Sequence, residues 1–353
     1  MGSRALQRAS LIELVEMAMP LLRRAEIECP RRGRGRRPTI PDWVLGALIM
    51  IAVLKRRKTK SGQYRFLQQH RDLLKHALGV DAFPARSTYF DRYRRAHHLF
   101  RAAVRLQGRQ AIREGVADGE CVSADKSLVA ASGPVWHQSQ RRRGVTPRGV
   151  DRNASWSYSE HHRWVYGYGF EVVVTAPKHG VVFPLLADIE TASVRETRTF
   201  LNKIPQLPPQ TKRILADSGY DTNDIGEAIE WTSDGKRTGR RFLCRQVKPR
   251  RKPRKQWRES RRRQQRRQRR EVRRSYFETA AAKRLYRRRG KTVEPFNQWF
   301  KHLFQIDDRV WHRGLDNNRT QLLAAMFCYQ LLLRYNHSRR LPHGQIQWIL
   351  DGL

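Results

Sequence analysis

The order of extended and helical segments after residue 119 restricts the fold of this chain more than any other feature. Residues 164–175 and 181–187 are rich in Val, Tyr and Phe and flank a Lys-His-Gly turn, which predicts a hairpin. Strands are expected at residues 122–128, 164–175, 181–187, 213–217 and 241–247, and helices at 197–204, 224–231 and 293–304. The order strand, strand, strand, helix, strand, helix, strand, insertion, helix predicts an α/β domain: a mixed five-stranded sheet flanked by helices.

The first 112 residues have a different character. Apolar residues from Leu11 to Leu22 recur near helical spacing, and Pro41 is suited to the first turn of a second helix. Several short helices with arginines on the outside fit a helix-turn-helix-like DNA-binding domain, and a helical scaffold without groove contacts fits nearly as well. We therefore expect a helical domain (1–112), an α/β domain (113–336) with an arginine-rich insertion at about 245–285, and a C-terminal tail (337–353).

The chain is strongly basic. Its 353 residues include 72 Lys and Arg against 32 Asp and Glu, a formal net charge of +40. Residues 245–274 hold 17 of the basic residues and only two acids, Glu259 and Glu271, so the rest of the chain still carries +25. Such a charge repels itself in the compact state, which predicts a polyanionic partner. The run itself is either a solvated linker or a phosphate-binding segment that orders on DNA.

The sequence argues against an anionic membrane as that partner. The longest apolar run, residues 43–54, is twelve residues long. A membrane-spanning helix needs about 20, so a buried core helix is expected here. The N-terminus lacks the pattern of a signal peptide. The four cysteines are far apart without a C-x-x-C pair, which indicates neither a zinc site nor a disulfide framework. A cytoplasmic nucleic-acid-binding protein is expected.

Three acids stand out within this basic chain. Asp125 comes at or just after the end of the strand residues 122–124, Asp217 ends the strand of residues 213–217, and Glu294 opens an amphipathic helix among arginines. Carboxylates at the ends of adjacent strands and on a helix above them can converge. Hard divalent cations prefer carboxylate and water ligands. Two such metals can activate a water or a 3′-hydroxyl and stabilise the leaving oxygen in phosphodiester chemistry.

Four segments resemble the DDE transposases of bacterial insertion sequences, which have a ribonuclease H-like catalytic core. Residues 122–131, VSADKSLVAA, are similar to the segment that holds the first Asp, and residues 215–221, LADSGYD, to the second motif. Residues 286–301, YRRRGKTVEPFNQWFK, resemble the third motif, and residues 151–168 the strand region after the first. The His-Asp pair that the family carries after the second hairpin is absent, because residues 190–196 read ETASVRE.

The resemblance implies a set of site residues. Asp125, Asp217 and Glu294 would be the catalytic residues and the ligands of two Mg²⁺ or Mn²⁺ ions, and the fold would be ribonuclease H-like. Tyr286, Arg289 and Lys301 would contact DNA phosphates near the cleavage site. The insertion would offer further DNA contacts through Arg261, Arg262, Arg263, Arg266 and Arg267. Trp156, Trp164 and Trp299 are interpreted as packing residues rather than as base-stacking ones.

The function that the resemblance implies is transposition in the bacterial cytoplasm or nucleoid. The protein would bind the terminal inverted repeats of its element, cleave the DNA by metal-dependent hydrolysis and join the 3′-hydroxyl ends to target DNA. Holding two ends together would need a homodimer on double-stranded DNA. Two alternatives stay open: a metal-dependent nuclease without strand transfer, and a non-catalytic, domesticated DNA-binding derivative.

Overall fold

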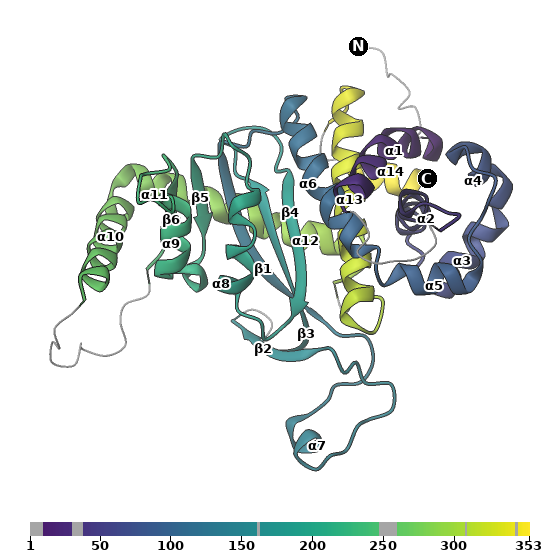
Figure 1. Cartoon of the computed structure of the whole chain (residues 1–353), viewed down its shortest axis with the longest axis horizontal. Coiled ribbons are helices and arrows are strands. Elements are labelled where there is room, and N and C mark those ends of the chain that lie inside the picture. The colour runs from purple at the N-terminus through teal and green to yellow at the C-terminus, as the bar shows by residue number, and fades with distance from the viewer. Residues whose placement is uncertain (1–9, 30–37, 161–162, 247–259, 308, 343–344) are drawn as a thin grey trace.

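The computed structural model describes residues 10–29, 38–160, 163–246, 260–307, 309–342 and 345–353 (Figure 1). Within these residues, six strands form one mixed sheet: β1 (Cys121–Ala130), β2 (Ser155–Ser159), β3 (Arg163–Thr175), β4 (Pro184–Thr191), β5 (Arg213–Ala216) and β6 (Arg241–Cys244). β1 pairs antiparallel with β3 and parallel with β5, and β6 continues in parallel beyond β5. β4 and β2 both pair antiparallel with β3, along different parts of its length.

The prediction of an α/β fold with a mixed sheet is confirmed, but the prediction of five strands is wrong. The sixth strand is β2. Three of its five residues are serines, so its composition does not predict a strand. It forms because its aromatic residues pack against those of β3, as Trp156 does with Tyr166 at a ring distance of 5.5 Å. β1 is also longer than expected, and Asp125 lies near its middle rather than at its end. The long antiparallel pairing with β3, from Val122 to Ala130, accounts for that length.

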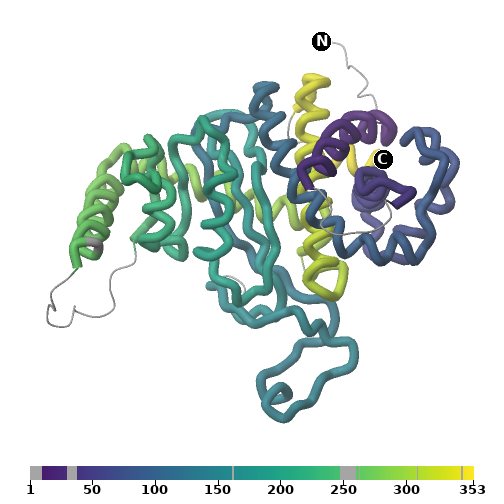
Figure 2. The backbone as a smooth tube through the Cα atoms, in the orientation of Figure 1, coloured from purple at the N-terminus to yellow at the C-terminus, as the bar shows by residue number. Residues whose placement is uncertain are grey.

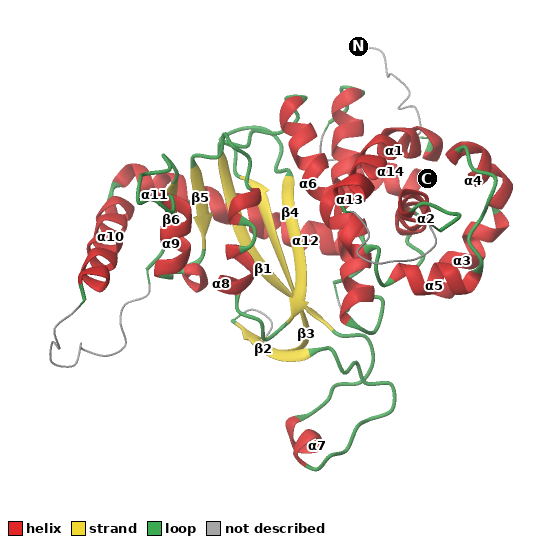
Figure 3. Cartoon of the chain, viewed as in Figure 1, coloured by secondary structure: helices red, strands yellow, loops and turns green. Residues whose placement is uncertain are grey.

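Helices cover the sheet. α8 (Glu196–Leu201) and α9 (Asn223–Glu230) follow β4 and β5, with short 3₁₀ turns η1 (Ile204–Gln206) and η2 (Ser218–Tyr220) beside them. α12 (Arg288–Leu303) packs on β1 and β3, where Phe300 stacks on Phe170 at 5.1 Å. α10 (Arg261–Glu278) and α11 (Ala280–Tyr286) lie beyond β6 at one end of the molecule, and the short α7 (Gln138–Arg142) projects from the lower edge of the sheet (Figure 3).

The other end of the molecule is helical. It consists of α1 (Leu11–Glu28), α2 (Asp42–Leu54), α3 (Lys60–Gln69), α4 (Arg71–Leu78), α5 (Arg86–Tyr93), α6 (His97–Arg113), α13 (Leu315–Ser338) and α14 (Ile346–Gly352). α6 and α13 lie between β4 and the remaining helices, and the first and last described helices, α1 and α14, both lie on this side (Figure 2). One cluster of buried side chains runs through both parts, so the helices and the sheet share a core. The C-terminal segment, expected as a tail, includes α14.

The apolar run of residues 43–54 is a core helix, as predicted. Every residue of α2 from Val44 to Leu54 is buried. Among the described helices, none is long and apolar enough to cross a membrane.

Candidate active site

The register of two parallel strands brings the first two acids together. β1 and β5 are paired so that Ser123 lies opposite Leu215. Asp125 and Asp217 each follow that pair by two residues, so they lie side by side at the same level of the sheet. Glu294 comes from α12, which packs across β1. Three segments that are distant in the sequence therefore converge at one edge of the fold.

Arg289 joins the three acids. Its Nη2 lies 2.6 Å from Oδ1 of Asp125 and 4.0 Å from Oδ2 of Asp217, and its Nη1 lies 2.7 Å from Oε1 of Glu294. The Arg289 side chain is only 13% exposed. Burial opposes its charge, but the carboxylates of Asp125 and Asp217 prevail and raise the pKa of Arg289. A buried guanidinium thus serves as the common counter-ion of the acids.

Asp125 has a second partner on the same helix. The side-chain amide of Asn297, one turn after Glu294, donates a hydrogen bond of 2.8 Å to Oδ2 of Asp125. Burial raises the pKa of Asp125 to about 6, although Arg289 acts in the opposite direction. The sequence analysis did not select Asn297. Its spacing of three residues from Glu294, which places both on one helix face, was the available signal.

Asp217 is held by the turn that follows it. Its Oδ1 accepts a hydrogen bond of 2.9 Å from the backbone N–H of Gly219. A Cβ at Gly219 would lie 2.2 Å from Oε2 of Glu196 and 3.0 Å from Oδ1 of Asp217. A side chain at position 219 would therefore displace the carboxylate of Glu196. The LADSGYD motif thus places its acid by local geometry, with glycine two residues after the acid.

Glu196 is a fourth carboxylate beside the site, and the sequence analysis did not select it. It opens α8, in the position where the His-Asp pair was noted as absent. Burial raises the pKa of Glu196 to about 7, and Asp217 adds to the effect. The contact was not visible in the sequence because it depends on how α8 packs on the turn after Asp217.

Comparison with protein families gives one match. The model of the transposase DDE domain matches residues 110–331, which include all three acids and Arg289. The chain belongs to the DDE transposase family. The resemblance inferred from the sequence motifs is thereby confirmed, and the mixed sheet with its helices is consistent with a ribonuclease H-like DDE domain. Comparison with curated proteins and with solved structures found no match.

Two of the residues expected to contact DNA in this transposase lie close to the acids, but with different surroundings. Tyr286 is half-buried at the end of α11, with its ring edge-on to Phe277. Burial raises the pKa of Tyr286. Lys301 is buried at 7% exposure and donates a hydrogen bond of 2.8 Å to the carbonyl of Leu128. Burial lowers the pKa of Lys301 to about 8. DNA contact by either residue stays a prediction.

The arginines of the insertion divide into two groups. Arg261 and Arg263 are exposed near the start of α10. Arg266 instead pairs with Asp224 at 3.3 Å and with Glu227 at 3.1 Å, on the neighbouring helix α9. Arg267 is exposed. The side chain of Arg262 and residues 247–259 of the basic run lie outside the part of the chain that the structure describes. α10 is thus partly neutralised by acids of its own fold.

The donor set at the site fits a hard divalent cation. Among the described residues, no three His, Cys, Asp or Glu side chains are grouped closely enough to hold a metal ion. The guanidinium of Arg289 lies between the acids and already contacts them as a cation would. All the acids are oxygen donors, which Mg²⁺ and Mn²⁺ prefer.

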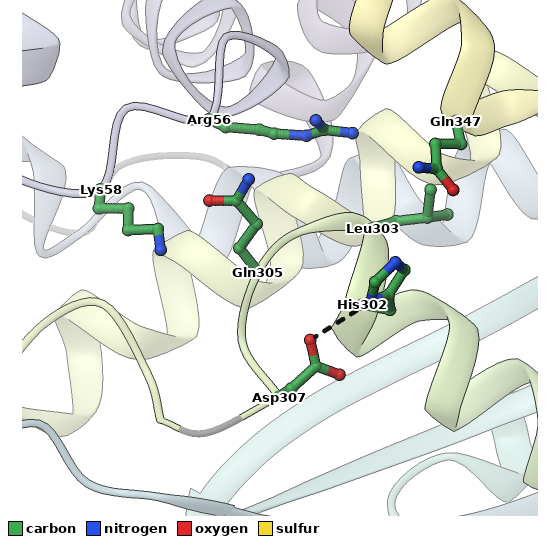
Figure 4. Close-up of a pocket in the computed structure, with 7 residues that line it drawn as sticks. All are labelled: Arg56, Lys58, His302, Leu303, Gln305, Asp307 and Gln347. Atoms are coloured by element: carbon green, nitrogen blue, oxygen red, sulfur yellow. Dashed lines mark ion pairs between the residues drawn. The ribbon is translucent and has the colours of Figure 1, made fainter.

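A cavity of about 370 Å³ between the loop after α2 and the end of α12 includes none of these acids in its lining (Figure 4).

Proposed function

We propose that this protein is a DNA transposase. It binds the terminal inverted repeats of its element, cleaves the DNA by metal-dependent phosphodiester hydrolysis and joins the 3′-hydroxyl ends to target DNA. The observation that supports this most directly is the convergence of Asp125, Asp217 and Glu294 on one guanidinium, in a chain of the DDE transposase family.

Asp125, Asp217 and Glu294 would hold the metal, Mg²⁺ or Mn²⁺, with two ions expected. Bound there, the ions would supply Lewis-acid activation of the attacking water or 3′-hydroxyl and stabilise the leaving oxygen. The protein's own contribution is orientation. Asn297 fixes one oxygen of Asp125. Arg289, released from the acids, can offer its two N–H donors to a phosphate in the same place.

DNA would be held by basic surfaces around this site. We assign phosphate contacts to the exposed Arg261 and Arg263 of α10 and to Arg267, with Tyr286 and Arg289 nearer the cleaved bond. The helical N-terminal part would bind the element ends, as a helix-turn-helix-like domain. Two copies on DNA would hold the two ends together, and the protein would act in the bacterial cytoplasm or nucleoid.

Asp217→Asn tests the proposal. The substitution keeps the shape of the side chain and removes the charge that a metal requires, so Mg²⁺-dependent cleavage of a plasmid carrying the element ends should be lost. Binding of the same DNA should persist. Asp224→Asn is the matched control, because Asp224 is exposed on α9 and its ion pair with Arg266 of α10 lies outside the site. This variant should cleave like the wild type.

Unchanged cleavage by Asp217→Asn would contradict the proposal. A strand-transfer assay with pre-cut ends separates the alternatives. Cleavage without joined product would identify a nuclease. If wild-type protein binds DNA but shows neither reaction, and calorimetry detects no Mn²⁺ binding in the presence of DNA, the chain is a non-catalytic derivative.

A further inference from the structure

The loop between β1 and β2 forms a distinct arm. Residues 131–150, hereafter the arm, leave the end of β1, include α7 and return to β2 (Figure 1). The outgoing and returning chains cross closely at its base. A Cβ at Gly133 would lie 2.6 Å from the carbonyl oxygen of Gly149, and both glycines have positive φ, 98° and 78°. Only glycine allows this crossing without strain.

The arm is built around two tryptophans. The indole N–H of Trp136 donates to the carbonyl of Val145 at 2.9 Å, and that of Trp156 on β2 donates to the carbonyl of Trp136 at 3.0 Å. The guanidinium of Arg141 lies over the Trp136 ring, 4.5 Å from its centroid. These contacts tie the two sides of the arm to each other and to the sheet, so the arm holds a defined conformation.

The remaining arginines of the arm face solvent. The arm contains no Asp or Glu. Arg142, Arg143 and Arg148 are exposed, and among the described residues none of them forms an ion pair with a carboxylate. The next acid along the chain, Asp151, is buried and accepts a hydrogen bond of 2.6 Å from the hydroxyl of Tyr168. The arm therefore carries positive charge that the fold does not neutralise, in contrast to Arg266 of α10.

The arm lies on the same side of the sheet as the Asp125 carboxylate. Asp125 is paired with Val172, and side chains two residues apart along β3 share its face. That face continues through Tyr166, which packs on Trp156 beneath the arm, to Trp164. Trp164 is 67% exposed and Tyr158 is 48% exposed, and the two rings pack on each other at 5.5 Å. Trp164 therefore packs on Tyr158 at the surface rather than in the core.

The separation between arm and site suits a DNA duplex. Five residues of β1 separate Asp125 from the base of the arm, which is about 17 Å at 3.3 Å per residue. Successive base pairs rise about 3.4 Å along the axis of a duplex, so this span corresponds to about five base pairs. A duplex with one phosphate at the acids can therefore reach the arm within half a helical turn.

We propose that the arm is a second DNA-binding surface of this protein, in which Arg142, Arg143 and Arg148 contact the phosphate backbone about five or more base pairs from the cleaved bond. The exposed Tyr158–Trp164 pair extends the same surface with apolar contacts. The inference rests on the proposed function, because it takes the acids as the place where DNA is cut. The arm acts on the same DNA as α10, which lies beyond the edge strand β6.

The test compares two triple variants in binding to a fluorescein-labelled 40-base-pair duplex, measured by anisotropy from 50 to 300 mM NaCl. Each arginine–phosphate contact adds about one to the slope of log affinity against log salt. Arg142→Gln/Arg143→Gln/Arg148→Gln should lower affinity and reduce the slope by about three. The control Arg109→Gln/Arg113→Gln/Lys212→Gln removes the same charge from exposed residues near the start of β1, whereas the arm leaves the end of β1, and it should change the slope by less than about one.

Equal slopes for the two triple variants would overturn the inference, provided that both variants melt at the wild-type temperature. If the triple arm variant fails to fold, the single variants Arg143→Gln and Arg143→Glu replace it. Arg143→Glu should then bind DNA more weakly than Arg143→Gln, and equal affinities would overturn the inference. Trp164→Ala should lower affinity without changing the slope, since its contact is not ionic, and an unchanged affinity would remove the aromatic pair from the surface. If the wild-type protein cleaves plasmid DNA and the arm variant binds DNA like the control, only the inference about the arm is refuted. Absence of cleavage in wild-type protein refutes the proposed function instead.

Discussion

At the scale of single residues, the site depends on one internal counter-ion. Asp125, Asp217 and Glu294 would repel one another in a partly buried position, and Arg289 offsets that repulsion through contacts of 2.6–4.0 Å. A divalent cation bound by the same acids would replace this role. If the acids bind metal as proposed, Arg289 would therefore couple the stability of the metal-free protein to the affinity of the site for metal.

This coupling predicts the behaviour of Arg289→Gln. Without metal, loss of the guanidinium leaves Asp125 largely buried and without its charged partner, at a cost of about 3 kcal/mol in the free energy of unfolding. Mg²⁺ should restore part of that loss, since the acids are then neutralised by the ion. Urea unfolding in EDTA and in Mg²⁺ measures both values. Arg287→Gln, an exposed neighbour, is the control; an equal loss for Arg289→Gln in both conditions would contradict the coupling.

The sequence predicted the acids at this scale and missed what surrounds them. Asp217 and Gly219 could be found because a strand end and a tight turn are local properties. Arg289 was named as a phosphate contact, and its contact with Asp125 was not foreseen because it depends on the packing of α12 against β1. Asn297 and Glu196 were missed for the same reason: each reaches the site from a helix whose orientation is set by the core.

At the scale of elements, the arginines of α10 have two roles: some pack against the neighbouring helix α9 and the residues around it, and others are exposed to solvent. Arg270 pairs with the buried Asp221 at 2.5 Å, Arg269 lies over the Trp231 ring at 3.8 Å, and Arg273 packs on Gly226. Arg261 and Arg263 lie on the part of the helix that is exposed to solvent. One face of α10 therefore holds the helix on α9, and the other is exposed to solvent.

Two pairs of substitutions separate these roles. Arg261→Gln/Arg263→Gln should lower the salt slope of DNA binding by about two and leave the melting temperature unchanged. Arg269→Gln/Arg270→Gln should instead lower the free energy of unfolding by about 3 kcal/mol, because the buried Asp221 carboxylate loses its ion pair with Arg270. Anisotropy titrations and thermal unfolding measure the two effects. A reversed pattern would mean that the exposed arginines are the structural ones.

A buried histidine between the end of α5 and the start of α13 should make the stability of the fold sensitive to acid. His312 is buried, with Nε2 3.0 Å from the hydroxyl of Tyr93. Burial lowers the pKa of His312 to about 3, and Lys60 adds to the effect. An unfolded histidine titrates near 6.5. As the pH falls below about 6.5, His312 is protonated in the unfolded chain but stays neutral in the folded chain. The free energy of unfolding therefore decreases toward pH 3.

The comparison of His312→Gln with the wild type isolates this contribution. Between pH 7 and 5, the wild type should lose about 2 kcal/mol more of its free energy of unfolding than the variant. Urea unfolding at each pH measures the difference. His179→Gln, in the exposed turn between β3 and β4, is the control and should follow the wild-type curve. Parallel curves for His312→Gln and the wild type would contradict the prediction.

At this scale the sequence predicted the five strands that have strong local patterns and the helices between them. β2 was missed because serine-rich segments have weak strand propensity, and only its packing on β3 stabilises it. The arm was missed because its order comes from hydrogen bonds of two tryptophans to backbone carbonyls. Such contacts leave no periodic pattern in the sequence.

At the scale of the whole molecule, the net charge of +40 acts on the folded state in two ways. In the free protein it is a self-repulsion, which salt screens because the Debye length falls from about 10 Å at 0.1 M to shorter distances at higher salt. In the complex the same charge binds phosphate, and salt weakens that binding steeply. Bound DNA stabilises the folded state by mass action.

The two effects predict salt dependences of opposite sign. Between 50 and 300 mM NaCl, the melting temperature of the free protein should rise, because screening relieves repulsion between basic surfaces such as the arm and α10. With excess 40-base-pair duplex, the melting temperature should start higher and fall over the same range, because DNA dissociates. Differential scanning fluorimetry with a dye that does not bind DNA measures both. Melting temperatures that change in the same direction with and without duplex would mean that the internal ion pairs, rather than the unneutralised charge, dominate the electrostatics of this protein.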